Sequence, residues 1–162
     1  MSVPWHYAIA VGSNLGDRAG SIAEGEAQLV ASGALVITAR SRLVETDAVL
    51  LVGAPRQPAY LNGAWIIATD LGPHQVLHLL QAAETRCGRT RAVPWGPRRL
   101  DLDLLLRADG LVMTSSVLAV PHPQLHRRRF VLEPLAEIAP TWRHPLLGQD
   151  IATLLAGLHP GR

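Results

Sequence analysis

Hydrophobic residues recur along the chain with two different periods, and these periods predict its secondary structure. In residues 73–88 the apolar positions follow the i, i+3, i+4, i+7 spacing of a helix, with Pro73 in its first turn and Gly88 at its C-terminal cap. Residues 18–32 have apolar positions in an alanine-rich, polar-backed stretch, which predicts a second helix. Apolar runs bounded by turn-forming residues predict four strands, at 7–12, 34–46, 60–71 and 100–106.

The order of these elements is strand, helix, strand, strand, helix, strand, which predicts an α+β fold. In such a split βαβ arrangement the sheet is antiparallel and both helices pack on one face. Beyond the fourth strand we expect a short apolar piece at 111–113, a loop at 120–129, a helix at 130–139 and a turn at 150–158. No repeat or linker interrupts the sequence, so residues 1–162 are expected to form a single domain.

Composition narrows the class of protein without changing this fold. With 48% hydrophobic residues and a net charge of +2, the chain reads as a globular protein, not as one that coats nucleic acid. Cys87 is the only cysteine, so no intrachain disulfide is expected, which favours a reducing compartment. No signal peptide is apparent, and no apolar stretch reaches the ~18 residues that span a bilayer. We therefore expect a cytoplasmic monomer that acts on small molecules, without a membrane or nucleic-acid partner.

The fourth strand carries two carboxylates in the stretch WGPRRLDLDLLL (95–106). Side chains two residues apart on a strand share a face, so Asp101 and Asp103 point to one side and the leucines between them to the other. Two ionised carboxylates repel each other unless a cation lies between them, and Mg²⁺ suits such oxygen ligands. The alternative is a solvated face on which both aspartates pair with neighbouring arginines.

Arginines are concentrated in two clusters near this strand, and the chain has no lysine. Guanidinium groups bind phosphate through two parallel hydrogen bonds, and metal ions with arginines recur in phosphoryl transfer. The clusters therefore favour a phosphate site, although an arginine run can also be a solvated loop. The first cluster comprises Arg86, Arg89, Arg91, Arg98 and Arg99, and the second comprises Arg127, Arg128 and Arg129.

The remaining candidates are each ambiguous when taken alone. The turn GSNLGD (12–17) lacks the glycine spacing of known phosphate loops, so we expect a strand-to-helix turn capped by Asn14 or Asp17. Tyr60 and Asn62 share one face of the third strand, where an asparagine suggests a hydrogen-bonding role. Three other residues could contact a ligand or belong to a solvated loop or the core: Trp95, His122 and Phe130.

Taken together, these segments resemble the 6-hydroxymethyl-7,8-dihydropterin pyrophosphokinase family of the folate pathway. The match follows family order through AIAVGSNLGDR, QPAYLNGAWIIATDL, GRTRAVPWGPRRLDLDLLL and VPHPQLHRRRFVLEPLAEIAP. The GR-x-R…WGPR-x-LDLD block is its most specific part. The resemblance implies a ferredoxin-like α+β fold and transfer of the β,γ-diphosphate of ATP to the pterin hydroxymethyl group, leaving AMP.

The resemblance also implies a set of site residues. Asp101 and Asp103 would hold two Mg²⁺ ions, and Arg89 and Arg98 would join them as catalytic residues by stabilising charge on the transferring group. ATP would be bound by Gln81, Glu84, Arg89, Arg91, Arg98, His122 and Arg128. The pterin would be bound by Thr46, Tyr60, Asn62, Trp95 and Phe130, with Tyr60 and Phe130 on its two faces.

Three features depart from the family pattern. The loop at 47–59 is longer than in many relatives and lacks a proline next to Thr46. The basic segment at 89–95 is one residue short, and His122 is followed by proline where some members have an aromatic residue. These departures concern loops around the site and leave both aspartates in place.

The strongest rival prediction is a non-catalytic ferredoxin-like module that binds a nucleotide or RNA through its arginines. RNA-binding sheets of this kind display aromatic side chains, whereas aromatic residues make up only 4% of this chain. Paired carboxylates would also repel a phosphate backbone in the absence of metal. A degenerate, inactive relative of the enzyme is a weaker rival, because the metal and phosphate positions all retain functional residue types.

Overall fold

The computed structural model describes residues 3–48, 51–88 and 99–158. The main sheet has the strand order β2-β4-β1-β5, and β3 continues beside β4 where β2 ends. Its pairs are antiparallel throughout. The strands of the described residues are β1 (Trp5–Ser13), β2 (Val36–Arg40), β3 (Val44–Thr46), β4 (Tyr60–Thr69), β5 (Asp101–Arg107), β6 (Met113–Thr114) and β7 (Ala119–Val120). The helices are α1 (Arg18–Ala31), α2 (Pro73–Arg86), α3 (Arg129–Ile138) and α4 (Ile151–Ala156), with a 3-10 turn, η1 (Leu125–Arg127).

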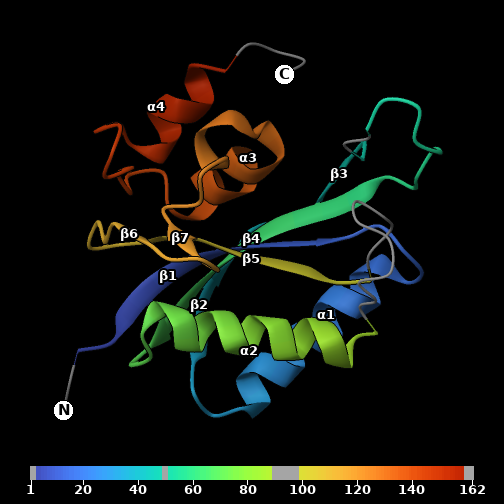
Figure 1. Cartoon of the computed structure of the whole chain (residues 1–162), viewed down its shortest axis with the longest axis horizontal. Helices are drawn as coiled ribbons and strands as arrows, with labels where there is room; N and C mark the ends of the chain where they lie inside the picture. The colour runs from blue at the N-terminus through green and yellow to red at the C-terminus, as the bar shows by residue number, and fades with distance from the viewer. Residues whose placement is uncertain (1–2, 49–50, 89–98, 159–162) are drawn as a thin grey trace.

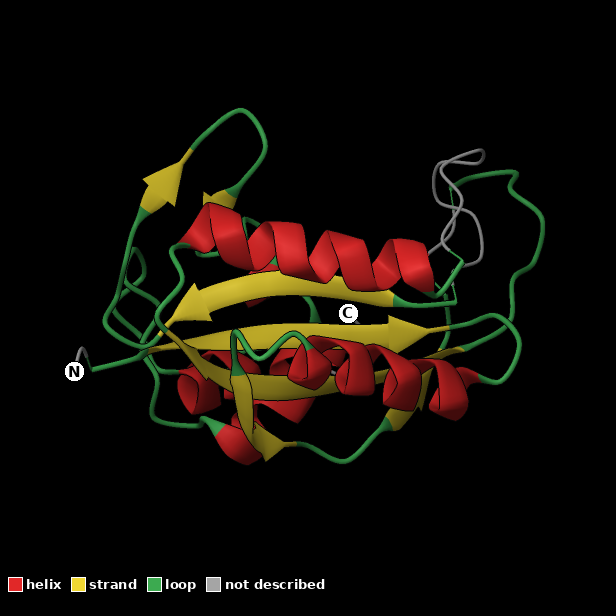
Figure 2. Cartoon of the chain, turned by 90° about the horizontal axis from the view of Figure 1, so that it is seen from below, coloured by secondary structure: helices red, strands yellow, loops and turns green. Residues whose placement is uncertain are grey.

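Helices cover both faces of this sheet (Figure 1). The helices α1 and α2 lie side by side across one face, as the split βαβ prediction requires (Figure 2). The α+β class and the element order are thus confirmed. The helices α3 and α4 form a further layer on the opposite face, where they bury Ala8, Ile66 and Leu106. Within the described residues, no helix is long and apolar enough to cross a membrane.

The predicted strand at 34–46 is divided into β2 and β3 by the connection Ser41–Leu43. Ser41 replaces regular pairing there: its N–H donates to the Ala64 carbonyl at 2.9 Å, and its Oγ accepts from Ala64 N at 2.8 Å. Gly63 makes this packing possible, because a Cβ at that position would lie 2.7 Å from Leu43 Cδ2. Side-chain hydrogen bonds of this kind compete with strand pairing and are not visible in hydrophobic periodicity.

Two further segments contain more regular secondary structure than the sequence predicted. The apolar piece at 111–113 leads into the hairpin formed by β6 and β7, and β7 contacts β5. The turn predicted at 150–158 contains the helix α4, which begins at Ile151. Asp150 caps this helix, and its Oδ1 accepts a hydrogen bond from Thr153 N at 2.8 Å. An N-terminal cap of this type stabilises a short helix that packing then holds in place.

Strand β5 contains a bulge beside its partner β1. Ala8 pairs with Leu106 and Ile9 with Leu104, which leaves Leu105 as the extra residue. The Leu105 carbonyl accepts a hydrogen bond from His122 N at 2.7 Å. The bulge therefore anchors the loop after β7 against β5, close to the two aspartates.

Candidate functional site

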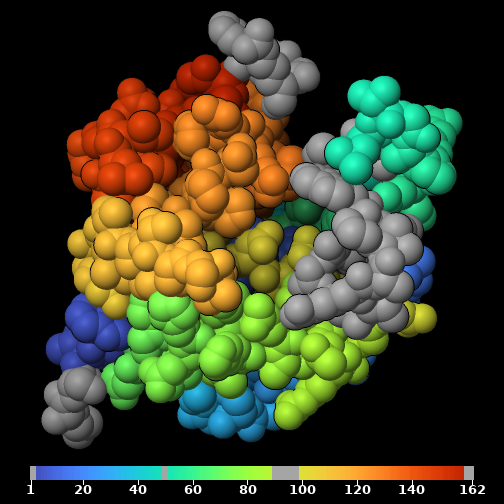
Figure 3. Space-filling model, in the orientation of Figure 1, coloured from blue at the N-terminus to red at the C-terminus, as the bar shows by residue number. Residues whose placement is uncertain are grey.

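One of the two aspartates lies in register with a glycine and an asparagine across the sheet. Asp101 on β5 pairs with Gly12 on β1, and Gly12 pairs with Asn62 on β4. In the next row, Asp103 pairs with Ala10. Because neighbouring strands are about 4.8 Å apart, about 10 Å separates the backbones of Asp101 and Asn62. Figure 3 shows a hollow over this part of the sheet, bordered by α2 and by the chain that leads into α3.

Gly12 forms the floor between these polar groups. A Cβ at Gly12 would lie 3.1 Å from Asn62 Oδ1, which is tighter than most packed contacts, and 3.4 Å from Tyr60 Cδ1, which is van der Waals contact. The absence of a side chain keeps the space above β1 open between β4 and β5. A flat ligand could therefore lie on β1 with hydrogen-bonding groups on one side and carboxylates on the other.

The asparagine is held by the short strand beside it. Asn62 is 7% exposed and its Nδ2 donates a short hydrogen bond to Thr46 Oγ1. Thr46 in turn pairs with Tyr60 in the ladder between β3 and β4. Three residues predicted for the pterin, Thr46, Tyr60 and Asn62, are thus brought together by the structure.

Side chains in and directly after the turn GSNLGD (12–17) hold the segment that leads into Tyr60 on β4. Asn14 is buried, and its Nδ2 donates to Gln57 Oε1 and to the Pro58 carbonyl, each at 3.1 Å. Arg18 Nη1 donates to the Ala59 carbonyl at 2.9 Å, so the chain leading into Tyr60 is held at consecutive points. The predicted helix cap is confirmed and is Asp17, whose Oδ1 accepts from Gly20 N at 3.0 Å.

Glu84 lies behind the two aspartates. It is 2% exposed, and its Oε2 accepts a hydrogen bond from Leu102 N at 3.0 Å. Leu102 is the residue between Asp101 and Asp103, so this buried carboxylate anchors the backbone that carries both. The sequence offered one signal for this role: Glu84 lies on the buried stripe of α2, where an acidic residue needs a partner. Gln81, one turn earlier on α2, is half-buried.

His122 is fixed in a single tautomer beside β5. Its Nδ1 accepts from Gln124 N at 3.1 Å, so Nε2 carries the proton of the neutral ring. Burial lowers the pKa of His122 below its ordinary value, the positive charge of Arg128 lowers it further, and Asp101 opposes both effects. The imidazole is therefore neutral near pH 7 and can donate one hydrogen bond from Nε2.

Arg128 and Phe130 lie at the start of α3, on the site face of the sheet. The Arg128 guanidinium carbon is 5.7 Å from the centre of the Phe130 ring, within cation–π range. Phe130 is half-buried against the core beneath α3 and α4. The predicted residues Arg89, Arg91, Trp95 and Arg98 lie outside the described residues.

The donor set can be tested against the expected metal. In the part of the chain that the structure describes, no three His, Cys, Asp or Glu side chains gather into a metal-binding group. A carboxylate pair on one strand suits a hard cation such as Mg²⁺, which binds through one or two carboxylates and completes its shell with water and phosphate oxygens. Asp101 and Asp103 are such a pair: they lie two residues apart on β5 and pair with the small residues Gly12 and Ala10 on the neighbouring strand.

Comparisons with known proteins point to a single family. The family model described as 7,8-dihydro-6-hydroxymethylpterin-pyrophosphokinase matches residues 8–140. The chain is 45% identical over 130 residues to 2-amino-4-hydroxy-6-hydroxymethyldihydropteridine pyrophosphokinase of Bacillus subtilis, covering 80% of this chain and 75% of the relative. It is 39% identical over 156 residues to the protein of the same name from Pseudomonas aeruginosa, covering 91% and 88%.

Solved structures agree with this at the level of fold. The crystal structure of wild-type Plasmodium falciparum HPPK-DHPS with pteroate matches with a TM-score of 0.70 at 15% identity. The match covers 94% of this chain and 42% of the Plasmodium chain. This chain therefore spans less than half of that longer protein.

Proposed function

The chain belongs to the 7,8-dihydro-6-hydroxymethylpterin-pyrophosphokinase family, and from this premise we propose how its own residues divide the reaction. The enzyme is an ATP-dependent diphosphokinase of folate biosynthesis. It transfers a diphosphate group from ATP to the hydroxymethyl group of the dihydropterin and leaves AMP. The observation that carries the site assignment is the row Asn62–Gly12–Asp101 across three strands.

The pterin half of the site is Gly12 with its neighbours on β3 and β4. Asn62 presents Oδ1 beside the open floor while its Nδ2 is held by Thr46, so its amide is oriented before any ligand arrives. Tyr60 and Phe130 provide aromatic faces, and a flat pterin is well held by such faces with a few convergent polar groups. Trp95 belongs to this proposal on the family resemblance alone.

The phosphate half is the carboxylate pair with the arginines. Asp101 and Asp103 would hold Mg²⁺, two ions in the family pattern, and Mg²⁺ neutralises charge on phosphate oxygens when bound. Arg89 and Arg98 are proposed to stabilise charge on the transferring group, with Arg91 supporting them. Arg98→Ala should mainly lower the rate, because a phosphate clamp matters most as charge redistributes.

The nucleotide side involves four described residues. Arg128 provides a positive charge at the start of α3, and His122 a neutral N–H donor beside it. Gln81, which is half-buried on α2, is proposed to contact ATP. Glu84 differs from these three: it is proposed to position β5 through Leu102 N, because its carboxylate is buried.

The proposed reaction does not require a general base among the described residues. Phosphoryl transfer depends chiefly on positioning and on electrostatic stabilisation of the transferring group. The pterin hydroxyl must therefore be held in line with the triphosphate. Binding of the pterin on the β4 side of Gly12 and of the phosphates on the β5 side would give this alignment.

The test is AMP formation from ATP and Mg²⁺, with and without 6-hydroxymethyl-7,8-dihydropterin. We expect AMP and the pterin diphosphate only when all components are present. ATP binding that does not depend on Mg²⁺ or on the pterin, together with RNA binding, would instead support the non-catalytic module.

We also propose that the enzyme is a cytoplasmic monomer. Cys87 is the single cysteine of the chain and cannot form an intrachain disulfide, which supports a reducing compartment. Burial raises the pKa of its thiol and the nearby Glu24 raises it further, which keeps the thiol protonated and unreactive. Sedimentation velocity of the purified chain tests the monomer, and a dimer at micromolar concentration would contradict it.

A further inference from the structure

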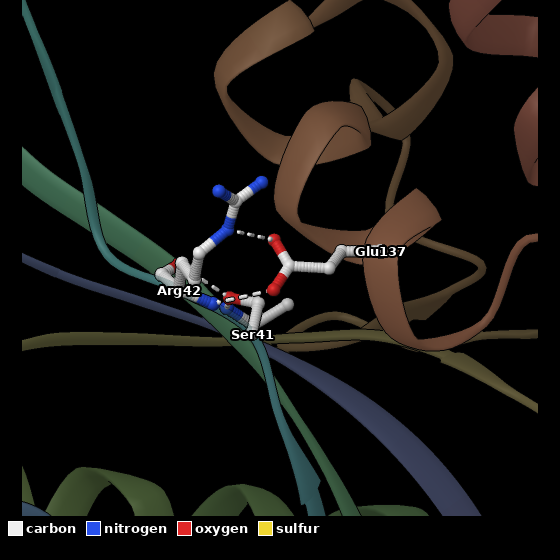
Figure 4. A network of polar contacts seen from close by, with 4 residues as sticks. Ser41, Arg42 and Glu137 are labelled. Carbon is white, nitrogen blue, oxygen red and sulfur yellow. Dashed lines mark hydrogen bonds and ion pairs between the residues drawn. The ribbon is translucent and has the colours of Figure 1, made fainter.

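A carboxylate on the last turn of α3 is bonded to the connection between β2 and β3 (Figure 4). Glu137 Oε1 accepts from the backbone N of Arg42 at 3.0 Å, and Oε2 accepts from Arg42 Nε at 3.4 Å. The Arg42 side chain is 87% exposed and that of Glu137 32%. An ion pair so exposed contributes little, whereas a backbone N–H bound to a carboxylate is a strong, directional contact. The backbone bond is therefore the important half of this contact.

The same connection is held from its other side by β4. Ser41 Oγ donates to the Arg42 carbonyl at 2.8 Å while accepting from Ala64 N. The backbone N–H of Arg42 is thus held by Glu137 of α3, and its carbonyl by Ser41, whose Oγ is itself bonded to β4. This arrangement leaves the chain little freedom before β3 begins at Val44.

The two parts joined in this way carry opposite sides of the proposed pterin pocket. The helix α3 carries Phe130 in its first turn and packs against β4 and β3. Strand β3 carries Thr46, whose hydroxyl accepts the hydrogen bond from Asn62. Glu137 thus makes a polar contact between the helix that carries Phe130 and the connection that leads into the strands of Thr46 and Asn62.

We infer that Glu137 is a positioning residue for the pterin half of the site. Its bond to Arg42 N sets the distance between helix α3 and the strands β3 and β4. Contact between flat rings depends steeply on that separation, since a gap of about 0.5–1 Å loses roughly a quarter to a half of the attraction. The inference rests on the proposed assignment of Phe130, Tyr60 and Asn62 to the pterin.

The test is a comparison of steady-state kinetics and thermal melting among single variants of the full chain. Glu137→Ala should raise KM for the pterin by roughly fivefold, with KM for ATP and kcat within about twofold of the wild type. Glu137→Gln keeps an oxygen acceptor for Arg42 N and should restore most of the affinity for the pterin. Arg42→Ala keeps the backbone donor and should resemble the wild type.

The matched control is Glu26→Ala on the opposite face. Glu26 pairs with Arg40 and its side chain is 27% exposed, close to the 32% of Glu137, but it belongs to α1. Its loss should leave KM for the pterin unchanged. A fall in melting temperature with equal changes in both KM values for Glu137→Ala would overturn the inference, as would a Glu137→Gln variant as impaired as Glu137→Ala.

Asn62→Ala separates this inference from the assignment on which it rests. If Asn62→Ala weakens pterin binding and Glu137→Ala does not, the positioning role fails and the pterin site stands. If Asn62→Ala also has no effect on pterin binding, the proposed pterin site fails and the inference fails with it.

Discussion

The two faces of the central strand β1 differ in the size of their side chains more than in their polarity. Toward α1 and α2 the strand presents Tyr7, Ile9 and Val11, all at most 2% exposed. Toward α3 and α4 it presents only small residues: Ala8, Ala10 and Gly12. The first face is a closed core from Tyr7 to Val11, whereas the second is closed only where α3 and α4 cover it. A site can therefore be opened on a buried strand by reducing side-chain volume at every second position.

The largest expected effect comes from the charged end of the open face. Asp101→Ala or Asp103→Ala should lower turnover by roughly a thousandfold or more with the fold intact, because a bound metal supplies several kcal/mol of charge stabilisation. AMP formation and circular dichroism measure the two properties. Asp109→Ala, just beyond the same strand and paired with Arg107, is the control and should retain activity. Near-normal turnover in either site variant would remove the metal assignment.

A smaller loss of activity is expected when a residue on the closed face, Glu84, no longer holds the backbone of β5. Glu84→Ala leaves Leu102 N without its acceptor, which should cost about 1–3 kcal/mol of stability. The displaced strand should lower kcat by roughly ten- to a hundredfold. Glu84→Gln should lose less, since its amide oxygen can accept the same bond. Gln81→Ala should instead raise KM for ATP; if Glu84→Ala changes only that constant, Glu84 contacts the nucleotide and does not act through β5.

One glycine on each face gives the most direct comparison. Gly12→Ala places a methyl group 3.1 Å from Asn62 Oδ1 and should raise KM for the pterin by roughly tenfold, with little change in melting temperature. Gly25→Ala places one 2.6 Å from Leu100 Cδ2 in the closed core. Overpacking of about 1–3 kcal/mol, partly offset by about 1 kcal/mol of helix propensity, should lower that melting temperature by roughly 2–4 °C with KM unchanged. Reversed outcomes would show that the two faces do not differ as described.

The smallest effect concerns the layer formed by α3 and α4. His144 is 4% exposed, and burial lowers its pKa below its ordinary value of 6.5, with His126 lowering it further. The unfolded chain therefore binds the proton more readily, so stability should fall as the pH falls below about 6.5. His144→Asn retains an acceptor for Leu146 N and Leu147 N and should make urea unfolding less dependent on pH between 7.5 and 5.5. The exposed His78→Asn on α2 is the control, and equal slopes in all three proteins would contradict the prediction.

The sequence predicted the features that depend on local pattern. The alternation in LDLDLLL correctly separated the leucines of the closed core from the two aspartates, and Asp17 was one of two residues expected to cap α1. The layer formed by α3 and α4 was not placed, because an amphipathic helix does not reveal which face of a sheet it will cover. The division of the strand at 34–46 was missed because it depends on Ser41 bonding to Ala64, a contact between distant residues.

The same limit applies to the site. Asp101 and Asp103 could be grouped from the spacing of two on a strand. For Glu84, the place on the buried stripe of α2 indicated only that its carboxylate needs a partner, and its assignment to the site came from the family resemblance. Its bond to Leu102 N depends on how α2 lies against β5, which no local pattern encodes. The register that brings Asn62 opposite Gly12 and Gly12 opposite Asp101 is likewise a property of the assembled sheet.

Among the described residues strand β5 is at the edge of the sheet, and an apolar edge strand can pair with another chain. Here the backbone N–H of Leu102 is occupied by a carboxylate of the same molecule, and the carbonyl of Leu105 by the N–H of His122. The hydrogen bonds made by Glu84 and by the His122 N–H therefore also block pairing of a second copy with that edge. Loss of Glu84 should expose the edge, so colloidal stability, and not only turnover, depends on this buried carboxylate.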